Sequence, residues 1–132
     1  MKRYQYYQPN KKDLKDRCPD CSIRALTKFE GITWVEAFDK LVGYARESQT
    51  VLNALPNIKR YMEETGYPYT ACYKDRLTVL DFAKAHPSGT YCLYVRSGYG
   101  THLVTVEDGA YFDTWDCGKR LIYGYWTKGG RH

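Results

Sequence analysis

The chain contains no apolar run approaching the roughly eighteen residues that a membrane-spanning helix requires. Its first residues, Met1 to Tyr7, are basic and tyrosine-rich, and they lack the apolar core of a secretory signal peptide. The sequence also lacks zinc-finger, RNP and recognition-helix patterns. We therefore expect a cytoplasmic protein that does not enter a membrane and that, despite a net charge of +5, does not bind nucleic acid.

Length and composition favour one folded domain. The 132 residues are 43% hydrophobic and 16% aromatic, which is typical of a folded chain rather than a disordered one. The five cysteines are an odd number in a chain without an export signal, so free thiols are favoured over a disulfide framework. We expect a basic, tyrosine-rich N-terminal arm over residues 1–17 and a single domain over residues 18–132.

Helix signals precede strand signals along the chain, which predicts an α+β fold. One helix is expected to begin at Cys21 and to end at Gly31, and a second follows a capping box formed by Thr33 and Glu36. The other expected elements are helices near 56–65 and 78–86 and strands over 90–95, 101–106, 110–115 and 121–126. We expect the helices, with the Cys21 helix in the centre, to pack on a C-terminal antiparallel meander.

Three residues in this order are typical of a cysteine nucleophile site: Cys21, His102 and Asp113. A helix N-terminus lowers the pKa of a thiol, and a nearby imidazolium stabilises the thiolate. A carboxylate on the next strand can then orient the imidazole, as in a catalytic triad. The pattern predicts that Cys21 attacks a carbonyl, that His102 acts as base and then acid, and that Asp113 orients His102.

For Cys21, metal binding is the main alternative to a role as nucleophile. Cys18 and Cys21 have the two-residue gap that lets two thiolates share one zinc ion. The chain has no matching second pair, although Cys72, Cys92, Cys117 or His102 would supply further ligands. Without zinc, Cys72, Cys92 and Cys117 are interpreted as structural. No cofactor is predicted.

The same segments carry a resemblance to a known family. Asp20-Cys21-Ser22-Ile23-Arg24-Ala25, Thr101-His102-Leu103-Val104 and Tyr111-Phe112-Asp113-Thr114-Trp115-Asp116 resemble motifs of papain-like cysteine peptidases encoded by bacteriophages. The resemblance covers about residues 18–126, and its order of Cys, His and Asp is similar to that of bacteriocin-leader peptidases and transglutaminases. It implies a papain-like fold, and hydrolysis of an amide or isopeptide bond through a thioester. It also implies a protein or peptide substrate, with a host protein in the host cytoplasm as one candidate.

The resemblance is incomplete at the oxyanion donor. Papain-like enzymes usually place a glutamine several residues before the cysteine, and here the nearest upstream glutamine is Gln8. Gln8, Lys15 and a backbone amide are the candidate donors. Asp20 is interpreted as the N-cap of the first helix, with a site role as the alternative, and Arg24 is expected to pair with a buried carboxylate such as Asp116.

Two other functions fit the same sequence. The same thioester intermediate would also allow transfer of the acyl group to an amine or deamidation of a glutamine. A catalytically inactive papain-like protein that binds a partner through its tyrosines and basic ends is the alternative from a different class.

Overall fold

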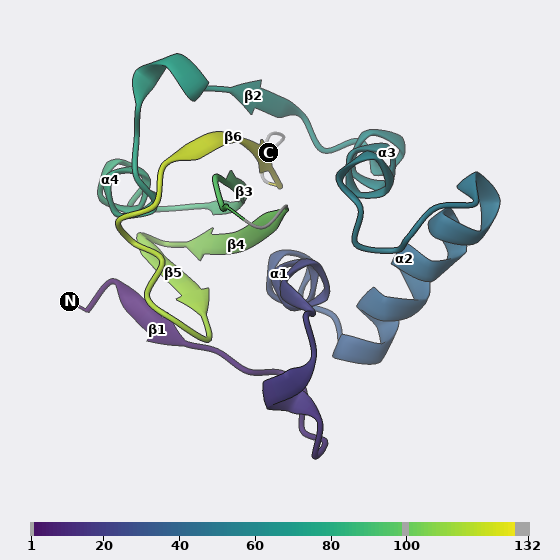
Figure 1. The fold of residues 1–132 in the computed structure, drawn as a ribbon. Helices are drawn as coiled ribbons and strands as arrows, with labels where there is room; N and C mark the ends of the chain where they lie inside the picture. Colours follow the sequence, from purple (N-terminus) through teal and green to yellow (C-terminus); the bar gives the residue numbers. More distant parts are fainter. Residues whose placement is uncertain (1, 99–100, 129–132) are drawn as a thin grey trace.

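A mixed β-sheet forms the centre of the computed structural model, which describes residues 2–98 and 101–128 (Figure 1). The strands are β1 (Tyr4–Tyr6), β2 (Tyr69–Ala71), β3 (Thr90–Val95), β4 (His102–Glu107), β5 (Ala110–Asp113) and β6 (Ile122–Thr127). The α-helices are α1 (Cys21–Glu30), α2 (Trp34–Ser48), α3 (Leu55–Thr65) and α4 (Val79–Ala85), and two 3₁₀ turns span Lys15–Arg17 and Tyr73–Asp75. The α+β class is therefore confirmed.

The sheet is more complex than the expected antiparallel meander. Its strand order is β1-β5-β4-β3-β6-β2. Strands β3, β4 and β5 do form a meander, but β6 returns to pair with the other side of β3. The expectation of a simple meander is therefore wrong, because β6 finds its partner across the sheet rather than beside β5.

The N-terminal arm belongs to the sheet, so the expected division at residue 17 does not describe the fold. Residues of β1 pair with β5 in parallel, with Tyr4 opposite Tyr111 and Tyr6 opposite Asp113. The ring centroids of Tyr4 and Tyr111 lie 5.7 Å apart, so the arm also packs aromatic side chains as expected. The sheet is therefore mixed, and it is not built from the C-terminal residues alone.

Local signals mark several of the helix ends. Thr33 and Glu36 form the predicted capping box of α2, and Thr78 forms another with Asp81 at the start of α4. Gly31 ends α1 with a φ of 69°, a left-handed conformation that glycine adopts at little cost. None of the described helices is long and apolar enough to cross a membrane.

The helices cover both faces of the sheet (Figure 1). Helices α1, α2 and α3 bury one cluster, which includes Ile23, Leu26, Phe29, Leu41, Ile58, Met62, Leu103 and Trp126. Helix α4 covers a second cluster, which includes Val79, Phe82, Leu93, Val95, Val104, Val106, Tyr111, Cys117 and Ile122. Alternate residues of β3 and β4 point into the two clusters, as the two-residue period of a strand requires. Both faces of the central strands are therefore buried.

Candidate active site

Cys21 is the first residue of α1, as the sequence predicts. The first amides of a helix have no partner within the helix and carry the positive end of its dipole, which favours a thiolate at this position. The Cys21 Sγ lies 3.5 Å from the Thr101 carbonyl oxygen, immediately before β4. The side chain is half-buried, so it is held by the fold and still reaches the solvent.

His102 and Asp113 meet because of the strand register. Val106 pairs with Tyr111 and Thr105 with Phe112, so the same register places Asp113 opposite Val104. His102 is then the diagonal neighbour of Asp113 on the same face of the sheet, within reach of a long side chain. The His102 Nε2 lies 2.8 Å from the Asp113 Oδ2, and both residues are buried. The predicted pairing of these two residues is therefore present.

The imidazole also contacts the Cys21 thiol. Burial raises the pKa of Cys21, but a hydrogen bond to His102, its charge and the Leu103 amide together bring this pKa below its ordinary value. Burial would lower the pKa of His102, yet its hydrogen bonds to Asp113, Cys117 and Cys21 raise it to about 11. The lowered pKa of Cys21 and the raised pKa of His102 both favour a thiolate and imidazolium pair. Since Nε2 is bound to Asp113, the other nitrogen, Nδ1, is the one available to Cys21.

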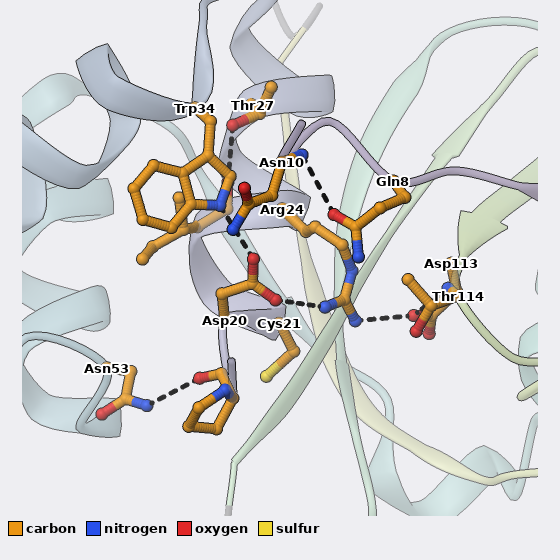
Figure 2. Close-up of polar contacts among 12 residues, drawn as sticks. Gln8, Asn10, Asp20, Cys21, Arg24, Thr27, Trp34, Asn53, Asp113 and Thr114 are labelled. Atoms are coloured by element: carbon orange, nitrogen blue, oxygen red, sulfur yellow. Dashed lines mark hydrogen bonds and ion pairs between the residues drawn. The ribbon is translucent and has the colours of Figure 1, made fainter. Parts of the chain in front are cut away.

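Arg24 completes the site from one turn along α1. Its guanidinium donates to the Asp20 Oδ1 at 2.5 Å and to the Asp113 Oδ1 at 2.9 Å (Figure 2). The pKa of Asp113 is raised by burial but falls below its ordinary value overall, because His102 and Arg24 stabilise the carboxylate. The expected partner of Arg24, Asp116, instead accepts from the Tyr111 hydroxyl at 2.5 Å. Arg24 therefore pairs with buried carboxylates as expected, but these are Asp20 and Asp113 rather than Asp116.

Asp20 occupies the N-cap position of α1, but its side chain does not cap the helix. Its carboxylate accepts from Arg24 and, through Oδ2, from the Trp34 Nε1 at 2.8 Å (Figure 2). The capping interpretation is therefore wrong, and the alternative of a site residue describes Asp20 better. A continuous chain of polar contacts runs from Trp34 through Asp20, Arg24 and Asp113 to His102.

The N-terminal arm holds the backbone of Asp113 in place. The Tyr7 amide donates to the Asp113 carbonyl oxygen at 2.9 Å, and the Tyr4 hydroxyl approaches the same oxygen at 3.2 Å. Gln8 follows directly, and its Oε1 accepts from the Asn10 amide at 3.0 Å (Figure 2). The arm thus brings Gln8 close to Asp113. The hydrogen bond between Gln8 and Asn10 stabilises a turn of the arm and does not involve the Cys21 thiol.

Lys15 lies apart from these residues. It is part of the 3₁₀ turn Lys15–Arg17, where its ammonium lies 3.8 Å from the carboxylate of Asp16. The structure therefore does not bring Lys15 to the thiol. The backbone amides at the start of α1 and the side-chain amide of Gln8 are the candidate donors of an oxyanion hole.

Cys117, which the sequence suggested was structural, is a member of the site. One ligand atom from each of His102, Asp113 and Cys117 lies within 4.8 Å of the others. Burial raises the pKa of Cys117 to about 11, so this thiol stays protonated. Asp113 and Cys117 lie close together in the sequence, which was a signal that they could be neighbours in the site. It is the turn after β5, however, that brings the two side chains together.

The cluster of His102, Asp113 and Cys117 is a poor cation site as it stands. The Asp113 carboxylate is already bound by Arg24 and His102, so a cation would have to displace these two partners. The alternative zinc pair, Cys18 and Cys21, does not join a group of three or more ligands within residues 2–98 and 101–128. All five cysteines carry free thiols.

Trp115 lies over the imidazole on the solvent side. Its ring centroid is 5.1 Å from that of His102, and the side chain is 41% exposed. His86, by contrast, is far from this chemistry, because it stacks on Phe82 with ring centroids 3.7 Å apart. His132 lies outside the described residues.

Comparisons of this chain with family models, with curated proteins and with solved structures find no match.

Proposed function

We propose that the protein is a papain-like thiol hydrolase that cleaves amide or isopeptide bonds in a protein or peptide. The observation that carries this proposal is the half-buried Cys21 at a helix N-terminus, in contact with His102, whose other side is bound to Asp113. The positions and order of these residues agree with the resemblance described above. A nucleophile, a base and an orienting acid are the parts that thiol catalysis needs.

The reaction follows from the charges of the pair. The Cys21 thiolate attacks the substrate carbonyl, and the amides at the start of α1 stabilise the negative charge that forms on its oxygen. Because the thiolate is consumed, His102 loses an anionic partner and its pKa falls, so it can give its proton to the departing amine. The thioester that results is hydrolysed by a water molecule whose proton returns to His102, and the free carboxylic acid and Cys21 are released.

Cys21 is the better nucleophile of the two thiols that contact His102. The pKa of Cys21 is lowered and its side chain is half-buried, whereas the pKa of Cys117 is raised and its side chain is fully buried. Reactivity of a cysteine depends on its thiolate fraction and its access to the substrate. Both criteria favour Cys21.

The first test is the rate of Cys21 alkylation by iodoacetamide as a function of pH, with labelled sites mapped by mass spectrometry. We expect a depressed pKa in the parent and an ordinary thiol profile in His102→Ala. His86→Ala is the matched control, because it removes a histidine that contacts Phe82 rather than Cys21. A parent profile with an ordinary pKa that is indifferent to His102 would overturn the proposal and favour an inactive binding module.

The second test separates the reactions that share a thioester. Peptides derived from a bacterial proteome are incubated with the parent and with Cys21→Ala, with and without added hydroxylamine. New peptide ends that require Cys21 indicate hydrolysis, amine-dependent adducts indicate acyl transfer, and conversion of glutamine to glutamate indicates deamidation. Absence of all three products, despite a reactive Cys21, would contradict the hydrolase assignment for these substrates. A host protein of the host cytoplasm is the substrate source that the resemblance implies.

A further inference from the structure

A second, positively charged feature lies at the same end of the sheet as the candidate active site. Val95 pairs with His102 on one side and with Ile122 on the other, so the segments that follow β3 and precede β6 begin next to the site. The Arg96 amide donates to the Leu121 carbonyl oxygen at 2.8 Å and joins these segments. Between them is an open hollow of about 280 Å³, lined by Arg96, Ser97, Gly98, Arg120 and Tyr123.

Aromatic rings hold the two guanidiniums of this hollow, hereafter the arginine hollow. The Arg96 Cζ lies 5.2 Å from the ring centroid of Tyr73 and 5.5 Å from that of Tyr123. The Arg120 Cζ lies 5.6 Å from the ring centroid of Trp115. Contact with a ring face restrains a guanidinium and leaves its N–H edge free to donate. Less rotamer entropy is then lost when a ligand binds.

The arginine hollow lacks an anion of its own. Its lining includes no Asp or Glu, and neither Arg96 nor Arg120 forms a salt bridge within the described part of the chain. This distinguishes them from Arg24, whose two carboxylate partners are both buried. Two arginines that face one hollow without a counter-ion form a site for an anion, and a carboxylate matches the fork of a guanidinium well.

Trp115 connects the arginine hollow to the reacting groups. Its indole contacts both the imidazole of His102 and the guanidinium of Arg120. A substrate that crosses Trp115 from Cys21 would therefore reach Arg120 within a few residues. We propose that the arginine hollow binds a carboxylate of the peptide substrate, from either an acidic side chain or a free C-terminus, and so directs the enzyme to acidic sequences. This inference rests on the proposed function.

The test uses peptides with an N-terminal iodoacetyl group, one to four glycine spacers and a final Asp with an amidated C-terminus. Each has a twin with Asn in place of Asp, and a third series ends in glycine with a free carboxylate. At the best spacing we expect the Asp peptide to label Cys21 roughly ten-fold faster than the Asn peptide, as two ion pairs of moderate strength imply. The free-carboxylate series tells whether a side chain or a chain end is preferred.

Two variants with the same change of charge separate local binding from general attraction. In Arg96→Gln/Arg120→Gln we expect the preference for Asp to fall to about one, where the preference is the ratio of the Asp and Asn rates measured on the same variant. In the matched control Lys11→Gln/Lys12→Gln, which removes two cations from the arm, we expect the preference to persist. Equal labelling by the twins at every spacing, or a preference that survives the loss of both arginines, would overturn the inference.

A binding measurement keeps this inference separate from the proposed function. In Cys21→Ser, the Nε–H resonances of Arg96 and Arg120 are followed by NMR while the same Asp and Asn peptides, without the iodoacetyl group, are added. We expect saturable shifts with Asp and none with Asn. Shifts with Asp, together with an ordinary Cys21 thiol, would refute the hydrolase and retain the carboxylate site. A reactive Cys21 without shifts would refute the carboxylate site and retain the hydrolase.

Discussion

Replacement of Arg24 by methionine tests the buried ion network directly. Arg24→Met keeps most of the side-chain length but leaves two carboxylates, Asp20 and Asp113, without their shared cation. These residues are only 2% and 1% exposed, and removal of one partner from a buried ion pair typically costs about 3–5 kcal/mol. Asp113 retains His102, and Asp20 retains the Trp34 N–H. We therefore expect the lower end, a loss of about 3 kcal/mol in the free energy of unfolding.

The assay is urea unfolding at pH 7, followed by far-UV circular dichroism. Arg60→Met is the matched control, because Arg60 also contacts two carboxylates, at 2.6 Å from Glu47 and 2.8 Å from Glu64, but on the surface. Solvent screens such pairs, so we expect a much smaller loss there. A loss for Arg24→Met that is no larger than for Arg60→Met would refute the reasoning. Asp20→Asn/Arg24→Met should recover part of the loss, because one of the two uncompensated charges is gone.

Three further predictions concern the same site. The folded pKa of His102 is about 11, above its ordinary 6.5, so its stabilising contribution is complete below pH 6.5 and declines as the pH approaches 11. Urea unfolding of the parent and of His102→Ala from pH 6 to pH 10 should show their difference shrink, and a constant difference would count against this charge state. Deletion of residues 1–7 removes β1 and the Tyr7 amide from Asp113, so we expect slower alkylation of Cys21 and lower stability; an unchanged rate would show that the arm does not position the carboxylate. Cys117 should escape iodoacetamide in the folded protein and react only after unfolding, and Cys117→Ser should keep the depressed pKa of Cys21, both read by peptide mapping.

Local signals in the sequence predicted most of the secondary structure. The capping box of Thr33 and Glu36 and the terminal Gly31 act within a single helical turn, so the sequence contains all the information that sets these boundaries. The three-residue strands β1 and β2 were missed, because each is too short to show a period and is defined by the strand it pairs with. The position of β6 beside β3 was missed for the same reason.

For the candidate site, too, some residues were identified from the sequence and others were not. Cys21, His102 and Asp113 were identified because residue type, order and a helix start are visible in the chain. The partners of Asp20 and Arg24 were not identified. A cap is the ordinary interpretation of an aspartate at a helix start, and Arg24 was expected to pair with Asp116. Only the packing of α1 on the sheet directs Arg24 to Asp113, and only the turn after β5 places Cys117 beside His102.

The two thiols around His102 show how the surroundings decide which cysteine reacts. Cys21 lies where a helix begins, and the Leu103 amide and the charges of His102 and Arg24 all stabilise its anion. Cys117 contacts the same imidazole, but burial raises its pKa, and the nearby charge of Asp113 adds to that effect. Asp113 acts mainly through His102, because it holds the cation that activates Cys21. It follows that Asp113→Asn should weaken the activation of Cys21, while Cys117, which burial keeps protonated, should remain unreactive in the folded protein.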